Sequence, residues 1–272
     1  MYTKVWIVAA KEWRDGWRNR WVIGATLIFA VMALGITWFG GVVNGQSGVL
    51  PLAATIASLS SLTVLVVPLI ALLLGYDAFV GEQEQGTLLL LLTYPLKKID
   101  LILGKFLGQL AILFVATLIG FGSAAVAFSW NNVSWSVIQT FLVFIISATL
   151  LGAVFLTLAH GLSLWVSEKA QAAGLALLVW FSLTLLYDLA LLALLVGREG
   201  WLNESMLTGL LMFNPTDLFR LINLVSIDAQ GMGVLASLGK MNISLPALYA
   251  CLMVWIVASL ALSLLRFHRK KV

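Results

Sequence analysis

The sequence has little charge, almost no cysteine and no nucleotide-binding loop. Only 10% of its 272 residues are Asp, Glu, Lys or Arg, and Cys251 is its single cysteine. One cysteine can build neither an intrachain disulfide nor a thiolate cluster, so we predict no metal bound by this chain. The pattern Gly-x-x-x-x-Gly-Lys-Ser/Thr is absent, which excludes a P-loop for phosphate. We therefore expect no bound cofactor, no catalytic residues and no ATP hydrolysis by this chain alone.

Long apolar stretches dominate the sequence instead. Its hydrophobic fraction is 61% and its mean hydropathy is +1.04, whereas soluble domains are nearer half apolar and a quarter charged. The longest stretch without Asp, Glu, Lys or Arg runs from Phe106 to Ser167. These values predict an integral membrane protein built from α-helices.

Charged residues and polar or Gly/Pro clusters divide the chain into six candidate spans, because a helix needs roughly 20 apolar residues to cross a bilayer core. The segment Ser129–Ser136 contains two tryptophans and two asparagines, which is typical of an interfacial turn, so it separates the third span from the fourth. We predict an all-α membrane protein with one domain over residues 1–272. Its spans are predicted at 21–43, 53–76, 106–128, 137–165, 170–196 and 246–265.

The lysines and arginines lie mostly on one side of these spans. Thirteen of the sixteen fall in the N-terminal arm, in the connections after the second and fourth spans, and in the C-terminal tail; the others are Arg198, Arg220 and Lys240. The positive-inside rule then places both termini in the cytoplasm. Because this asymmetry explains the net charge of +4, we do not predict nucleic-acid binding.

Residues 1–20 have the pattern of an amphipathic helix. Trp6, Trp13 and Trp17 recur on one face, while Arg14 and other charged residues lie largely away from it. Such a helix lies flat on a membrane surface. We predict an interfacial helix on the cytoplasmic side. Two roles stay open for it: a membrane anchor, or a docking element for a cytosolic partner.

The connection 82–98 is predicted to form a short cytoplasmic helix. Acidic residues precede five consecutive leucines, which are too few to cross a membrane, and a proline with two lysines closes the segment. This charge order suits the helix dipole. The leucine-rich face needs a cover, either its own bundle or a protein partner, and we favour the partner. The residues assigned to this contact are Glu82, Glu84, Gly86, Thr87, Leu88, Leu91, Pro95, Lys97 and Lys98.

The outer connection 197–245 is too long for a simple link between helices, so we expect structure within it. Asn214 has the position of an N-cap, Pro215 that of the first helical residue, and Asp217 that of an acid in the first turn. The apolar residues that follow, which include Phe219, predict a helix either half-sunk in the outer leaflet or tucked between spans.

Asp188 is the one acidic residue within a predicted span. An ionisable side chain at membrane depth is costly and faces protein or water. No predicted span contains a lysine or arginine that could neutralise it. We therefore expect Asp188 to be protonated, hydrogen-bonded to a hydroxyl side chain or exposed to a wet cavity. A structural contact and a place on a transport pathway both stay open.

The order of these segments resembles the permease subunits of type 2 ATP-binding cassette (ABC) exporters. Three stretches carry the resemblance, which covers essentially the whole chain: Lys11-Glu12-Trp13-Arg14-Asp15 before the first span, Glu82 with Gly86-Thr87, Pro95 and Gly104-Lys105 in the second cytoplasmic connection, and Asn214-Pro215 before the last span. The resemblance implies a homodimer in the bacterial inner membrane, surrounded by lipid. It also implies that segment 82–98 contacts cytosolic ABC ATPases, which bind ATP and magnesium.

More narrowly, the sequence is similar to the membrane subunits of ABC complexes that support copper-centre assembly in bacterial nitrous oxide reductase. That similarity implies a periplasmic copper-handling or scaffold partner. An ATP-independent membrane scaffold and a lipid or polysaccharide exporter of the same family are the alternatives. The predicted spans offer only His160, Cys251 and scattered methionines as soft donors, so we do not expect copper to pass along protein ligands.

Overall fold

The computed structural model describes residues 2–43, 51–130, 134–197, 204–227 and 244–270. All secondary structure in these ranges is helical, which confirms the all-α prediction. In chain order the helices are α1 Tyr2–Arg18, α2 Arg20–Val43, α3 Leu52–Gly75, α4 Val80–Glu84, α5 Thr87–Thr93, α6 Lys98–Ser129, α7 Trp135–Trp165, α8 Lys169–Phe181, the π-helix η1 Ser182–Leu186, α9 Tyr187–Gly197, α10 Glu204–Phe213, α11 Pro215–Ser226 and α13 Leu245–Arg269.

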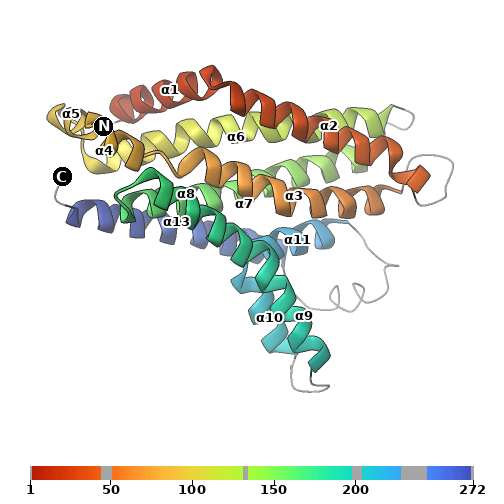
Figure 1. Cartoon of the computed structure of the whole chain (residues 1–272). Helices are drawn as coiled ribbons and strands as arrows, with labels where there is room; N and C mark the ends of the chain where they lie inside the picture. The colour runs from red at the N-terminus through yellow and green to blue at the C-terminus, as the bar shows by residue number, and fades with distance from the viewer. Residues whose placement is uncertain (1, 44–50, 131–133, 198–203, 228–243, 271–272) are drawn as a thin grey trace.

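Within the described ranges, six helical segments are long and apolar enough to cross a membrane, as predicted. They comprise α2, α3, α6, α7, the continuous run α8–η1–α9, and α13. The start of α1 and the end of α13 lie at the same end of the bundle (Figure 1). We call this end the terminal end and the other the opposite end.

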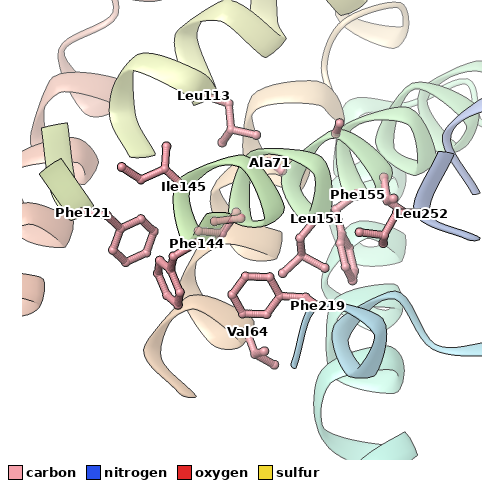
Figure 2. Close-up of a cluster of buried hydrophobic side chains, with 14 of the residues drawn as sticks. Val64, Ala71, Leu113, Phe121, Phe144, Ile145, Leu151, Phe155, Phe219 and Leu252 are labelled. Atoms are coloured by element: carbon pink, nitrogen blue, oxygen red, sulfur yellow. The ribbon is translucent and has the colours of Figure 1, made fainter. Parts of the chain in front are cut away.

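Helix α7 lies at the centre of the bundle. It packs against α3, α6, α8, α11 and α13, and its residues Phe144, Leu151 and Phe155 have no exposed surface. Figure 2 shows these side chains among residues contributed by α3, α6, α11 and α13. One apolar core therefore joins most of the spans around α7.

A row of four phenylalanines crosses this core from α2 to α11. Phe29, Phe121, Phe144 and Phe219 contact one another in that order, edge to face, with ring centroids 4.8, 4.6 and 5.6 Å apart. Edge-to-face contacts are favourable between aromatic rings. The row joins four helices that are distant in the chain.

Helices α1 and α2 pack one after the other along α6. An added Cβ at Gly104 would lie 2.5 Å from the Cβ of Val8, and one at Gly108 would lie 2.7 Å from the Cβ of Glu12. Because the partners are four residues apart on both helices, α1 runs alongside the start of α6 in the same direction. It follows the bundle axis here instead of lying across it, in contrast to the flat orientation expected from its amphipathic pattern.

Segment 82–98 forms two short helices instead of the single helix predicted. Helix α4 ends at Glu84 and α5 begins at Thr87, and Gly86 between them has a φ of +71°, a conformation that glycine adopts most readily. Helix α6 then begins at Lys98, earlier than the predicted span, because Asp100 accepts a hydrogen bond of 3.2 Å from the backbone N–H of Lys97.

Helix α11 is tucked between spans, one of the two placements expected for it. Its residues from Pro215 to Asn223 are nearly all buried, and it packs against α7, α13 and α3. Asn214 is its N-cap, accepting a hydrogen bond of 3.1 Å from the backbone N–H of Thr216. Residues 198–203 and 228–243 of the predicted outer segment, and residues 131–133 of the predicted turn, lie outside the described residues.

The fifth span is not a continuous α-helix. It contains the π-helix η1, and the carbonyl of Leu183 within it accepts a hydrogen bond of 2.9 Å from Nδ2 of Asn214. Beyond η1, α9 and α10 point away from the other helices (Figure 1). The cap of α11 is thus bonded to the span at the point where that span bends.

Gly108→Ala should loosen the packing of α1 on α6. The added Cβ would lie 2.6 Å from the backbone oxygen of Ala9, which cannot rotate away, so we expect the free energy of unfolding to fall by about 1–3 kcal/mol. Gly122→Ala is the matched control, because it lies on the same helix with nothing within 4 Å, and it should be neutral or slightly stabilising. Equal melting temperatures of the two variants in the same detergent would contradict this close packing.

Candidate functional site

A buried ion cluster joins three segments at the terminal end. Nζ of Lys105 in α6 lies 2.9 Å from Oε1 of Glu12 in α1 and 2.8 Å from Oε1 of Glu82 in α4. Nζ of Lys11 lies 3.2 and 3.4 Å from the same two carboxylate oxygens. The side chain of Lys105 is only 3% exposed, so this contact is almost removed from water. We call these four residues the Lys105 cluster.

Opposite charges compensate for the burial of this cluster. Burial raises the pKa of Glu12, but the charges of Lys105 and Lys11 outweigh it and bring that pKa below its ordinary value. Burial lowers the pKa of Lys11, and the carboxylates of Glu12 and Glu82 more than reverse the effect, so its pKa is raised. Glu12 and Lys11 are therefore both charged at neutral pH, and each depends on its partners to remain so.

Two uncharged side chains extend the cluster to the centre of the bundle. Nε2 of Gln109 donates to Oε2 of Glu12 at 3.1 Å, and Oε1 of Gln109 lies 2.8 Å from Nε2 of His160 in α7. Because an amide oxygen only accepts, His160 donates from Nε2 in this contact. Polar contacts therefore run without interruption from α1 and α4 through α6 to α7.

Helix α7 also stabilises the junction between α3 and α4. Oγ of Ser163 accepts hydrogen bonds from the backbone N–H groups of Phe79 and Val80, both at 3.0 Å. It thereby supplies a cap for the start of α4 from a distant part of the chain. The ring of Phe79 packs edge to face on His160 with centroids 5.6 Å apart. His160 and Ser163, close in sequence, thus both have structural partners.

Helix α5 has one packed face and one exposed face. Leu88 is only 1% exposed, and Leu91 packs beside it in an apolar cluster that includes Phe267. Leu89 and Leu90 are 55% and 63% exposed. Of the residues predicted to contact a partner, Leu88 and Leu91 face inward, and the exposed face consists of their neighbours Leu89 and Leu90.

Other residues predicted for this contact attach segment 82–98 to its surroundings. The contacts are Glu84 Oε1 with the backbone N–H of Lys169 at 2.6 Å, Thr87 Oγ1 with the carbonyl of Glu82 at 3.1 Å, Lys98 Nζ with the carbonyl of Phe267 at 2.7 Å, and the carbonyl of Pro95 with Nζ of Lys4. Glu84, Pro95 and Lys97 are exposed at this end. Both ends of the segment are therefore hydrogen-bonded to other helices.

The aromatic residues predicted for α1 do not form its buried face. Trp6 is 65% exposed, and Trp13 and Trp17 are partly buried, edge to face, with ring centroids 5.6 Å apart. Arg14 is exposed. The buried face carries Glu12 instead, which a hydrophobicity pattern assigns to the polar side because its partners are not visible in the local sequence.

A second ion cluster, at the opposite end, gives Asp188 a charged partner. Arg220 of α11 lies 2.7 Å from Oδ2 of Asp188 and 2.9 Å from Oδ1 of Asp217. The expectation that no cation neutralises Asp188 is wrong, because α11 lies outside the predicted spans yet packs among them. Burial raises the pKa of Asp217 to about 6, against the opposing charge of Arg220. Asp188 therefore ties the fifth span to α11.

Little in the local sequence predicts the Lys105 cluster. Lys105 and Gln109 are four residues apart, which places two polar side chains on one face at the start of an apolar helix, and that is the only local signal. Their partner Glu12 lies 93 residues from Lys105 in the chain, and Glu82 lies 23 residues away. The pairing depends on how α1 and α4 fold back, which local patterns do not encode.

The helical bundle with both termini at one end is the architecture of a multi-pass membrane subunit, and sequence comparison assigns its family. Residues 6–272 match the family described as "ABC-2 family transporter protein", and the chain therefore belongs to the ABC-2 transporter family. Two similar proteins are each named "Probable ABC transporter permease protein NosY". The protein of Stutzerimonas stutzeri is 50% identical and that of Pseudomonas aeruginosa 51% identical, each over 98% of this chain and 99% of the relative. These findings confirm the resemblance to ABC permeases and identify a transmembrane permease subunit, a class that associates with an ATPase partner.

Lys105→Met should destabilise the protein, because Glu12 and Glu82 would then be buried with only Lys11 to compensate them. We expect the free energy of unfolding to fall by about 3–5 kcal/mol. The triple variant Lys105→Met, Glu12→Gln, Glu82→Gln removes the uncompensated charges as well and should recover most of this loss. Denaturant unfolding measures both. A triple variant no more stable than the single one would show that charge compensation does not hold this end together.

Proposed function

We propose that this chain is the non-catalytic membrane subunit of an inner-membrane ABC complex, and that it converts ATP hydrolysis by a cytosolic partner into movement of its spans. The Lys105 cluster carries the proposal. It connects α4, which α5 follows directly in the chain, to both α1 and α6. ATP and magnesium bind in the partner ATPase, because this chain has no P-loop.

The terminal end is the proposed cytoplasmic side. The asymmetry of lysine and arginine favours this orientation. It brings the exposed leucines of α5, Leu89 and Leu90, to the side on which ATP is available. The opposite end, with α11 and the second ion cluster, then faces the periplasm.

Force on α5 would reach the bundle through α4. Glu82 ties α4 to Lys105 in α6, and Ser163 ties its first residues to α7. Separating a buried ion pair is costly, about 3–5 kcal/mol when one partner is removed. A shift of α4 therefore moves α6 and α7 with it more readily than it breaks these contacts. Both helices extend to the opposite end, where α7 packs against α11.

In the assembled complex, two copies of this chain would supply twelve spans to two ATPases. The 50% and 51% identity to the relatives named NosY and the resemblance to nitrous oxide reductase maturation complexes both support a role in copper-centre assembly. The moving part would then act on a periplasmic copper-handling or scaffold protein. Among the described residues, no group of three or more His, Cys, Asp or Glu side chains is placed to hold a metal ion. We accordingly propose transmitted movement and not conduction of copper along protein ligands.

Leu89→Glu with Leu90→Glu should uncouple the ATPase without unfolding the subunit. Both side chains are exposed and outside the Lys105 cluster, so two charges there disrupt an apolar docking surface while leaving the fold intact. We expect at least a tenfold loss of co-purified ATPase, about 1.4 kcal/mol of binding free energy. Ser167→Glu, an exposed position in the loop between α7 and α8, is the control and should bind normally. Normal ATPase binding and stimulation by the double variant would exclude α5 as the docking surface.

Single cysteines at Ser136 and Ser167 test the orientation, in a Cys251→Ser background. Both positions are exposed, Ser136 near the start of α7 at the opposite end and Ser167 just after its terminal end. A membrane-impermeant thiol reagent added to intact spheroplasts should label Ser136→Cys immediately and Ser167→Cys only after the membrane is opened. The reverse order of labelling would invert the proposed orientation.

A further inference from the structure

The second ion cluster contains one cation and two anions. Arg220 lies 2.7 Å from Oδ2 of Asp188 and 2.9 Å from Oδ1 of Asp217, so a single guanidinium serves both carboxylates. Their other oxygens, Oδ1 of Asp188 and Oδ2 of Asp217, are buried and have no hydrogen-bond partner among the described residues. When both acids are ionised, one negative charge is uncompensated. Two carboxylates that share a site favour protonation of one of them.

Asp217 is the carboxylate whose charged form is less favoured. Its side chain is only 5% exposed, compared with 31% for Asp188 and 39% for Arg220. Burial, together with the negative charge of Asp188, raises the pKa of Asp217 to about 6. The contact with Arg220 and the place of Asp217 in the first turn of α11 favour the charged form, but they do not outweigh this burial.

The helices around α11 supply no second cation among the described residues. Helix α11 packs against α3, α7, α10, α13 and η1. Helix α3 and η1 contain no ionisable residue, and the basic residues of α7 and α13 lie at the terminal end (Figure 1). The titratable residues on the side of Asp217 are Tyr187 and Asp188 in the fifth span, Glu204 at the start of α10, and Tyr249 and Cys251 in α13. None of them carries positive charge, so a proton on Asp217 removes the excess charge without any movement of these helices.

The same cluster holds α11 against the bend of the fifth span. Arg220 joins α11 to Asp188 in α9, and Asn214 at the start of α11 donates to the carbonyl of Leu183 in η1 at 2.9 Å. When Asp217 is neutral, Arg220 compensates Asp188 alone. When Asp217 is ionised, α11 has a buried excess charge, which favours any movement that exposes this charge to water. The protonation state of Asp217 therefore affects how firmly α11 is packed.

We propose that Asp217 is a proton-binding group through which the pH at the opposite end sets how firmly α11 is held among the spans. Acidification neutralises Asp217 and tightens α11 on the fifth span, and a rise in pH loosens it. In the orientation proposed above, this is the pH of the periplasm. The direction follows from linkage, because the pKa of Asp217 is higher than its ordinary value of 3.8. Its contribution to stability is complete below about pH 4 and is lost as the pH rises through about 6.

Amide hydrogen exchange of α11 tests the proposal on the full-length chain in lipid nanodiscs. Exchange of residues 215–226 is followed by mass spectrometry and corrected for the pH dependence of the chemical exchange rate. We expect the opening of α11 to be about tenfold less favourable at about pH 5 than at about pH 7.5, as linkage gives for one proton with this pKa. Asp217→Asn keeps a neutral side chain of the same shape, so its α11 should be equally protected at both pH values. Glu168→Gln, which changes an exposed carboxylate at the terminal end, should keep the pH dependence.

Asp188→Asn provides a result that a purely structural role of Asp217 would not produce. The charge of Asp188 contributes to raising the pKa of Asp217, so its removal should shift the midpoint of the pH dependence to lower pH. An unshifted midpoint would contradict the proposal.

The unmodified chain keeps the proposal testable if either variant fails to fold. Protection of its α11 should rise as the pH falls through about 6, whereas protection of the first two turns of α6 should not rise. Equal protection of α11 at about pH 5 and about pH 7.5 would overturn the proposal.

Discussion

The ammonium group of Lys105 is the charge on which the terminal end of this bundle depends. A lysine that is 3% exposed requires carboxylates in direct contact, and here they come from α1 and α4, two helices separate from α6. Burying any one of these charged side chains alone would be costly because it loses its hydration. Their burial together is tolerated because opposite charges are in contact. The cluster therefore fixes the positions of both segments relative to α6, and apolar packing of α1 on Gly104 and Gly108 completes the arrangement.

The opposite end follows the same physical rule with different residues. Arg220 connects α11 to the fifth span through Asp188, and Nδ2 of Asn223 donates to Oγ of Ser147 in α7 at 3.0 Å. Between the two ends, the core formed by the described residues contains no charged side chain. In lipid, apolar packing alone distinguishes poorly between neighbouring helices, since lipid chains are as apolar as leucine. Polar contacts at the two ends thus specify which helices are neighbours, and close packing holds them there.

Composition and the spacing of charges were sufficient to predict the six spans, because hydrophobicity over some 20 residues is a local property. The N-cap role of Asn214 was equally local and is confirmed. The partner of Asp188 was not a local property, since Arg220 lies on α11 and this helix packs among spans to which it does not belong. The contacts of Glu12, Glu82 and His160 were not predicted either, because their partners lie on other helices. A pairing across 93 residues leaves no periodicity in the sequence, and Glu82 was assigned to an external contact although its carboxylate points inward to Lys105.

The π-helix η1 accommodates one extra residue in the fifth span without changing the direction in which later side chains point. A π-turn holds one more residue than the α-turn it replaces, and one residue corresponds to about 100° of rotation around an α-helix. Deleting a residue within Ser182–Leu186 would therefore convert this turn to an ordinary α-turn and leave α9 in register with α8, with Asp188 still directed to Arg220. The carbonyl of Leu183 would return to its own helix and leave Asn214 without this hydrogen bond. The extra residue thus serves the contact between the fifth span and the cap of α11.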